Sequence, residues 1–306
     1  MFARIAPLLL LAGCTAAQTA QPAALPALPQ AGLSSTQFAE QCEPWDEWDK
    51  PAPPFRILGN SWYVGTCGIA SILIADPAGH VLIDSGTEKG AAVVLANLRT
   101  IGVDPKDVRY ILASHEHFDH VGGHAVLAAA TGAEIVASAE AAPVLESGKV
   151  SPDDPQADAG HPDMTPVTVA RMVADREVLT LGDIAITAHL TPGHSPGATS
   201  WTWTACSGPD EPPVCRRLAY VDSLSPVSAD SYRFSDHPEV VTAFRSSLEK
   251  VAALPCDELL TPHPSASQLI EKLRSGSMGI AGQCQAYARA LGERLDKRLA
   301  EETAGG

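Results

Sequence analysis

Short apolar runs rich in Val, Ile and Leu alternate with polar stretches along the first half of the chain. Runs of this length, bounded by Gly and Asp-Pro turns, predict strands. We expect strands at 55–58, 61–64, 70–75, 81–83, 108–113 and 134–137. The spacing of the apolar residues predicts helices at 89–98, 124–130 and 139–146. The first half therefore opens with antiparallel strands and continues as alternating strands and helices.

The second half follows the same order of strands and then helices. We expect strands at 178–181, 184–190, 199–204, 218–221 and 259–260, and helices at 238–254, 267–273 and 282–299. Residues 147–166 between the halves carry six Gly or Pro residues and few large apolar ones. They predict a long loop of the kind that often flanks a binding site. The order indicates an α/β protein with two comparable halves around one core.

Composition limits the choice of partners. The chain has 306 residues, 45% of them hydrophobic, with 36 acidic and 21 basic residues and a net charge of -15. Nucleic acids and anionic membranes attract clustered Lys and Arg, so this balance argues against both. An anionic substrate would need a local cation, such as a metal ion. Without basic neighbours, Trp45, Trp48, Trp201 and Trp203 are expected to be packing aromatics.

The amino terminus predicts export. Residues 1–20 combine a basic residue with an apolar run too short to span a bilayer as a mature helix, which is typical of a signal peptide. The Leu-Ala-Gly-Cys segment ending at Cys14 resembles a bacterial lipobox, and the alternative is cleavage near Ala17 or Ala20. Residues 21–40 predict a flexible tether before a domain at 41–306. We expect a periplasmic protein, anchored to the outer membrane if Cys14 is lipidated.

Six further cysteines are even in number and show no C-x-x-C zinc pattern. In an oxidising compartment they are most simply three disulfides, although six cysteines allow 15 connectivities. Pairing nearest neighbours in the sequence gives Cys42 with Cys67, Cys206 with Cys215, and Cys256 with Cys284. Free structural thiols are the alternative.

A dense group of potential metal ligands follows the strand at 108–113. Residues 114–120 read Ser-His-Glu-His-Phe-Asp-His. Alternate residues of an extended segment point the same way, so His115 and His117 can converge on one ion, with Asp119 and His120 turned to a second position. Imidazole nitrogen with a carboxylate suits zinc, with iron or manganese as alternatives. The other interpretation is a solvated polar loop.

Two later His residues also follow predicted strands. His194 lies in a Thr-Pro-Gly-His-Ser-Pro-Gly turn, and His263 in Leu-Leu-Thr-Pro-His-Pro. Pro and Gly favour tight turns that leave a side chain projecting. Alone, each would more often be a surface His, but an incomplete metal site upstream makes both candidate ligands.

Together these segments resemble the metallo-β-lactamase superfamily and, more narrowly, its subclass B3, from about Cys42 to the carboxyl terminus. The resemblance implies a four-layer αββα sandwich with two β-sheets flanked by helices and a dinuclear zinc site. It implies that the first zinc is held by His115, His117 and His194 and the second by Asp119, His120 and His263. Ser223 stands where other lactamase subclasses carry a Cys ligand. Some secreted members also resemble this chain in cysteine pairing.

The resemblance implies hydrolysis of the β-lactam amide bond of penicillins, cephalosporins and carbapenems by a zinc-bound hydroxide, which confers antibiotic resistance. Asp119 would also orient that hydroxide, and Ser223 and Ser225 would bind the substrate carboxylate. Asp84 follows a strand and would orient a ligand His or the His-rich loop, or only cap a turn. Glu116 replaces the small residue expected between the two His. His124 and His161 are the other His residues expected nearest the site.

Two other functions remain open. A glyoxalase II-like thioesterase or a lactonase shares the His motif but uses a metal-bridging Asp, which Asp222 could supply. A non-enzymatic zinc-binding lipoprotein would need a closed coordination shell. The Gly-His-Ser-Pro-Gly turn at 193–197 precedes a predicted strand and not the helix that a nucleophile elbow requires, and no S-x-x-K motif has matching partners, so the usual serine hydrolases are not expected. For the lactamase we expect a monomer that binds a small β-lactam and no nucleic acid, with membrane contact only through Cys14.

Overall fold

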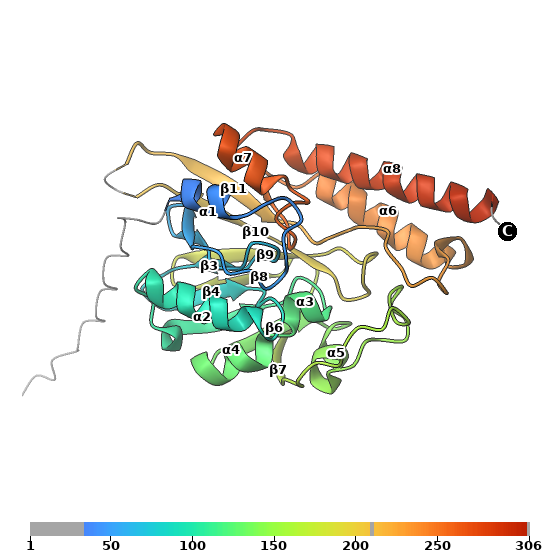
Figure 1. Ribbon diagram of the computed structural model, residues 1–306, viewed down its shortest axis with the longest axis horizontal. Coiled ribbons are helices and arrows are strands. Elements are labelled where there is room, and N and C mark those ends of the chain that lie inside the picture. The colour runs from blue at the N-terminus through green and yellow to red at the C-terminus, as the bar shows by residue number, and fades with distance from the viewer. Residues whose placement is uncertain (1–33, 209–210, 305–306) are drawn as a thin grey trace, which may run out of the picture.

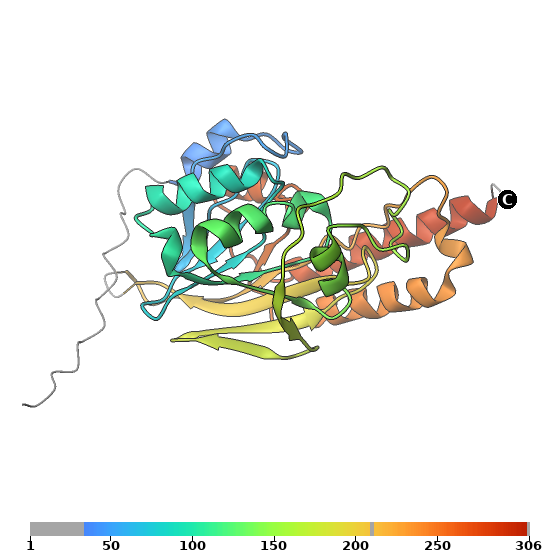
Figure 2. The same cartoon turned by 90° about the horizontal axis from the view of Figure 1, so that it is seen from below.

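The computed structural model describes residues 34–208 and 211–304. Two β-sheets lie face to face, and helices cover the outer face of each (Figure 1). The view turned by 90° shows the same layers from below (Figure 2). This arrangement confirms the predicted αββα sandwich. None of the helices in the described residues is long and apolar enough to cross a membrane.

The first sheet contains seven strands in chain order. They are β1 (Phe55–Leu58), β2 (Ser61–Tyr63), β3 (Ile72–Ile74), β4 (His80–Ile83), β5 (Val108–Leu112), β6 (Glu134–Ser138) and β7 (Val169–Val173). Strands β1 to β4 pair antiparallel, whereas β4 to β7 pair parallel. Parallel neighbours bring the carboxyl ends of β4 and β5 to the same edge of the sheet.

The second sheet has five strands. Their order across the sheet is β12 (Glu258–Leu260), β11 (Cys215–Tyr220), β10 (Thr199–Cys206), β9 (Ile184–Leu190) and β8 (Val178–Leu181). Only β11 and β12 pair parallel in this sheet, and the remaining neighbours pair antiparallel.

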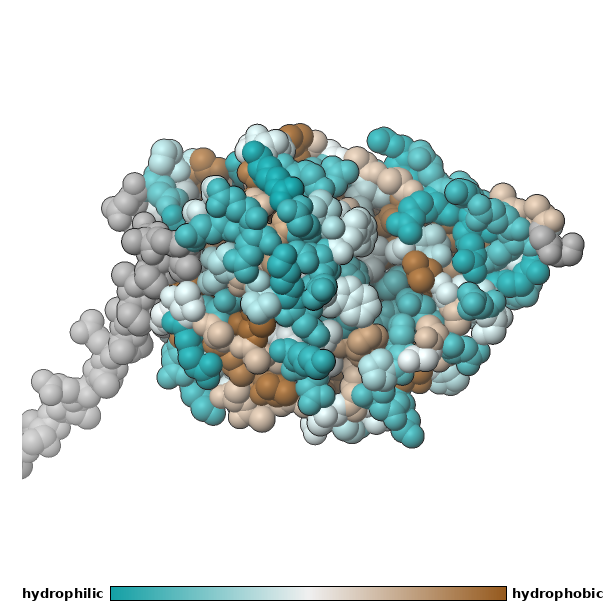
Figure 3. All heavy atoms as spheres, viewed as in Figure 1, coloured by the Kyte–Doolittle hydropathy of each residue, from teal (hydrophilic) through white to brown (hydrophobic). Residues whose placement is uncertain are grey.

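Helices complete the two outer layers. The first sheet is covered by α2 (Gly90–Thr100), α3 (Phe118–Val121), α4 (His124–Thr131) and α5 (Ala142–Ser147), and the second by α6 (Pro238–Ala252) and α8 (Gln283–Ala304), with α1 (Ser35–Gln41) and α7 (Leu269–Ser275) packed together at one end. Short 3₁₀ turns occupy η1 (Pro105–Asp107) and η2 (Phe234–Asp236). Figure 3 shows that hydrophilic residues cover most of the face seen in Figure 1.

Alternation along the strands explains the layers. In β3, Ile72 and Ile74 pack between the sheets, while Leu73 between them faces the helices. Successive strand residues point to opposite faces of the sheet. Both faces of this strand are covered, one by the second sheet and one by helices, and both are therefore apolar. Trp201 and Trp203 of β10 lie in the core between the sheets, which confirms the packing role predicted for them.

Three elements differ from the expectation. Helix α1 occupies residues predicted as tether, because Ser34 caps it and Phe38 is buried with its ring 5.0 Å from that of Phe55. The folded domain therefore begins before residue 41. Strand β7 was missed because only Val169 and Val173 of this edge strand are buried. The third is the short helix α3, whose first turn contains Asp119. The spacing of apolar residues does not predict this helix.

The predicted cysteine pairing is confirmed. Disulfides join Cys42 to Cys67, Cys206 to Cys215, and Cys256 to Cys284. The first fixes the end of α1 beside the loop before β3, the second joins the ends of β10 and β11, and the third ties α8 to the residues before β12. Residue Cys14 and the predicted signal segment lie outside the described residues.

Candidate metal centre

Three imidazoles that are far apart in the sequence converge where their strands end. His115 and His117 follow β5 and His194 follows β9. Their potential ligand atoms lie within 4.8 Å of one another, and all three side chains are buried. The turn that carries His194 packs tightly, since a Cβ on Gly193 would lie 2.7 Å from the Phe244 ring. The structure thus brings together the first predicted ligand set.

Each of these imidazoles has an oxygen close to the nitrogen that is not assigned to the ion, as a hydrogen-bond acceptor for His117 and His194 and as an ion-pair contact for His115. These oxygens are Asp222 Oδ1, 2.8 Å from His115 Nδ1, Asp154 Oδ2, 2.9 Å from His117 Nε2, and the Ser225 carbonyl, 2.9 Å from His194 Nδ1. Such contacts fix the tautomer and orientation of metal-binding imidazoles. They leave His115 Nε2, His117 Nδ1 and His194 Nε2 available for an ion.

The cluster fits a metal. Within the described residues, the buried Nε2 of His115 and both ring nitrogens of His120 lack a hydrogen-bond partner. Buried polar atoms are normally paired, because leaving one unsatisfied costs free energy. Burial, followed by the neighbouring His117 and His115, lowers the pKa of His194 to about 3. A neutral imidazole is the form that binds a metal ion.

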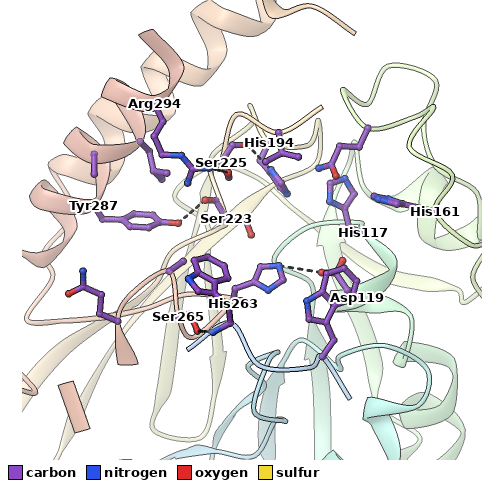
Figure 4. Close-up of a pocket in the computed structure, with 18 of the residues that line it drawn as sticks. His117, Asp119, His161, His194, Ser223, Ser225, His263, Ser265, Tyr287 and Arg294 are labelled. Atoms are coloured by element: carbon purple, nitrogen blue, oxygen red, sulfur yellow. Dashed lines mark hydrogen bonds and ion pairs between the residues drawn. The ribbon is translucent and has the colours of Figure 1, made fainter. Parts of the chain in front are cut away.

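The second predicted set lies beside the first. Asp119 Oδ2 is 3.0 Å from His120 Nε2 and 3.3 Å from His263 Nε2. The rings of His120 and His263 are 4.9 Å apart, and His263 follows β12 in the chain. Figure 4 shows His263 pointing toward Asp119. Burial opposes ionisation of Asp119, but His120 and His263 outweigh it and hold the pKa of Asp119 well below its usual value. A carboxylate and two imidazoles are thus grouped at a second position.

Asp84 supports the His-rich loop from behind. Its Oδ1 accepts from the backbone N–H of Ser114 at 2.7 Å, and its Oδ2 accepts from Ser114 Oγ and from the Tyr220 hydroxyl, each at 2.7 Å. The nearest ring nitrogen of His120 is 3.9 Å away, beyond hydrogen-bond distance. Burial raises the pKa of Asp84 to about 7. Asp84 therefore positions the start of the loop and not a ligand directly.

A cavity of about 660 Å³ opens above the two ligand sets. Its wall includes Ser223 and Ser225, as expected for substrate contacts, and also His161. The ring of His161 lies 5.7 Å from that of His117, which confirms its predicted approach to the site. His124 instead lies buried behind the site, with Nδ1 2.7 Å from Ser85 Oγ.

Sequence reasoning missed several residues of this site. Asp154 and Gln156 come from the loop at 147–166, where Asp154 holds His117 and Gln156 lines the cavity. The length and Gly/Pro content of that loop were the available signal. Trp45 and Trp48 also line the cavity and are 68% and 42% exposed, so the packing role predicted for this pair is wrong. Their rings lie 6.4 and 5.9 Å from that of His263.

Glu116 points away from the cavity and joins two ligand loops. Its Oε2 accepts from Ser195 Oγ and its Oε1 from the backbone N–H of Gly197, both at 2.8 Å. Ser195 and Gly197 belong to the turn that carries His194. The unexpected carboxylate therefore connects the His115–His117 segment to that turn.

Replacing Glu116 by Ala should lower the free energy of unfolding of the metal-free protein by about 2–4 kcal/mol, because two buried donors lose their acceptor. Chemical denaturation monitored by circular dichroism measures this change. The matched control is Glu88→Ala, an exposed carboxylate that should change stability by no more than about 0.5 kcal/mol. Equal stability of the Glu116 variant and the wild type would show that these two hydrogen bonds of Glu116 do not stabilise the fold.

Comparisons with known proteins agree with this geometry. A family model described as the metallo-beta-lactamase superfamily matches residues 64–206. The crystal structure of MIM-1 from Novosphingobium pentaromativorans is 52% identical, with 89% of this chain and 99% of that chain covered and a TM-score of 0.84. MEM-A1, a subclass B3 metallo-beta-lactamase isolated from a soil metagenome library, is 40% identical, with 85% and 100% covered and a TM-score of 0.80.

A more distant relative carries a different activity in its name. The hydroxyacylglutathione hydrolase of Anaeromyxobacter dehalogenans (strain 2CP-C) is 31% identical over 131 residues. The match covers 43% of this chain and spans only 40% of the length of that curated relative. The two lactamase structures match over nearly their whole length and at higher sequence identity than this hydrolase. The chain therefore belongs to the metallo-beta-lactamase superfamily and, within it, to subclass B3.

Proposed function

We propose that this protein hydrolyses the amide bond of β-lactam antibiotics with two zinc ions. The observation that carries the proposal is the pairing of a three-His cluster with an Asp-His-His cluster beneath one open cavity. Imidazole and carboxylate are the ligands that zinc favours. The cavity volume of about 660 Å³ suits a small molecule.

His115, His117 and His194 would hold the first zinc, and Asp119, His120 and His263 the second. When bound, the two ions supply Lewis acidity at the lactam carbonyl and lower the pKa of water to near neutrality. The described residues supply no activated Ser or Cys to the cavity wall, where Ser223 and Ser225 have no adjacent general base. The residues of the chain therefore bind and orient the substrate, and the ions would activate the water that acts as nucleophile.

Individual side chains have separate tasks. Asp222, Asp154 and the Ser225 carbonyl fix the three imidazoles of the first set before substrate arrives. Ser223 Oγ is buried without a partner among the described residues, so it can donate to a substrate carboxylate at no cost in existing bonds. Trp45 and Trp48 offer apolar surface at the cavity wall for the rest of the substrate.

The position of Asp222 argues against the thioesterase and lactonase alternative. A bridging carboxylate would have to face both ligand sets. Asp222 Oδ1 instead lies 2.8 Å from His115 Nδ1, the nitrogen opposite the available one, and Asp222 Oδ2 accepts from the backbone N–H of Leu224. The open cavity argues against a non-enzymatic zinc protein, because a structural site would be closed.

We also propose that the protein is exported to the periplasm, with a signal in residues 1–20 that is cleaved before Cys14, the lipidation site. Three disulfides support this, since such bonds persist in oxidising compartments. The mass of the mature amino terminus tests it. A lipidated chain beginning at Cys14 is the expected result, and an uncleaved chain beginning at Met1 would contradict export.

Purified, zinc-loaded protein should hydrolyse a chromogenic cephalosporin and a carbapenem, and a chelator should reduce both rates to background until zinc is added back. The reason is that the described residues place no activated Ser or Cys in the cavity wall. Rates with a glutathione thioester and a lactone provide the comparison. If the zinc-loaded protein cleaved the thioester or the lactone but neither β-lactam, the proposed function would be wrong.

A further inference from the structure

Arg294 on α8 places a guanidinium group in the wall of the cavity. In Figure 4 it lies across the cavity from His117 and Asp119 and points toward Ser225. Its Nη2 donates to Ser225 Oγ at 3.0 Å. Within the described part of the chain, Arg294 is the only Lys or Arg among the residues that line this cavity.

This guanidinium lacks a neutralising partner. Arg245 and Arg298 on neighbouring surfaces pair with Asp296 and Glu302 at 2.7 and 2.6 Å. For Arg294, residues 34–208 and 211–304 supply no carboxylate oxygen within 4.0 Å. In a chain with 36 acidic and 21 basic residues, an arginine without an acidic partner in a cavity is positioned for an anion from outside.

The base of Arg294 is held rigidly. Helix α8 is tied to the residues before β12 by the disulfide of Cys284, and its Leu291 and Leu295 are buried in the core. The hydroxyl of Tyr287, two turns earlier on the same helix, donates to the Ser223 carbonyl at 2.7 Å. The helix therefore fixes Arg294 relative to both serines of the cavity, which reduces the entropy lost on binding.

Ser225 connects Arg294 to the first ligand set. The Ser225 hydroxyl accepts from Arg294, while its carbonyl accepts from His194 Nδ1 at 2.9 Å. Only Ser225 would therefore separate an anion held by Arg294 from the proposed metal ligand His194. Bicyclic β-lactams carry a carboxylate on the carbon next to the lactam nitrogen, so such a substrate presents its acid and its scissile bond close together. Guanidinium binds carboxylate through two parallel hydrogen bonds.

We propose that Arg294 is a specificity-determining residue that binds the substrate carboxylate and so selects β-lactams with an acid next to the lactam nitrogen. This inference rests on the proposed β-lactam hydrolysis. It adds a residue of α8 to those already proposed to contact the substrate, which are Ser223 and Ser225.

The test compares a chromogenic cephalosporin with the methyl ester of its carboxylate. In Arg294→Ala, the ratio of kcat/KM for the acid to that for the ester should fall roughly 10- to 100-fold, carried by a higher KM for the acid and not by kcat. The ratio does not depend on the fraction of active protein. Arg294→Lys keeps the charge but not the planar fork, so its ratio should lie between those of Ala and wild type.

Arg289→Ala is the matched control. Arg289 is an exposed arginine on the same helix outside the cavity wall, and its replacement removes the same charge, so the ratio should stay at the wild-type value. An unchanged ratio and KM in Arg294→Ala, or an equal fall in Arg289→Ala, would overturn the inference while leaving the proposed function intact. Wild-type protein that hydrolysed neither substrate would overturn both.

Discussion

Replacing Asp119 by Ala is expected to lower kcat/KM for a β-lactam by at least about 100-fold, since loss of a partner behind a ligand alone costs about 10- to 100-fold. Asp119 is the carboxylate shared by the second set, 3.0 Å from His120 Nε2 and 3.3 Å from His263 Nε2. Without it, two neutral imidazoles remain to hold a doubly charged ion. Zinc content measured on the dialysed variant should therefore fall from two ions per chain to one.

Glu271→Ala controls for the loss of one negative charge from the cavity wall. Glu271 lines the same cavity from α7 but lies outside both ligand sets, so kcat/KM should change by less than about threefold and zinc content should stay at two. An Asp119 variant that kept two zinc ions and wild-type kcat/KM would show that the second set is misassigned.

Asp222→Ala is expected to weaken zinc binding at the first site by about 10- to 100-fold while leaving both sites able to fill at excess zinc. The physical reason is that His115 loses the carboxylate that lies 2.8 Å from its Nδ1, so the ring and its tautomer are no longer fixed. Competition with a chromophoric chelator measures the affinity, and activity at excess zinc should partly recover. Asp222 is fully buried, so the folded state of the variant is checked by circular dichroism.

Asp222→Asn gives the matched comparison, because its amide oxygen can still accept from His115 Nδ1. It should retain more zinc affinity than the Ala variant. A bridging carboxylate predicts the opposite pattern, with one zinc lost from both variants at any zinc concentration. That result would favour the thioesterase-type site over the lactamase.

The ligand sets could be predicted from the sequence because each is encoded locally. The apolar run of β5 ends directly before His115, and the Pro and Gly residues around His194 and His263 announce turns that leave the side chain projecting. Strands β3 and β4 could also be predicted, because a strand buried on both faces appears in the sequence as a continuous apolar run.

The residues that hold the ligands could not be predicted in the same way. Nothing in the local sequence separates Asp154 from its neighbour Asp153, yet only Asp154 meets His117. Trp45 resembles a core residue by its hydrophobicity. Its loop is nevertheless held at the cavity wall by the Cys42–Cys67 disulfide and by a hydrogen bond of 2.7 Å from the Trp45 backbone N–H to Ser265 Oγ. Such contacts depend on tertiary structure, which one-dimensional patterns do not record.

A zinc titration of metal-free protein, with hydrolysis of a carbapenem measured at each step, tests the central claim most directly. We predict no hydrolysis without metal and a rise that reaches its maximum at two zinc ions per chain, as the two ligand sets require. Hydrolysis by the metal-free protein, or no hydrolysis of the carbapenem when two zinc ions are bound, would contradict the claim.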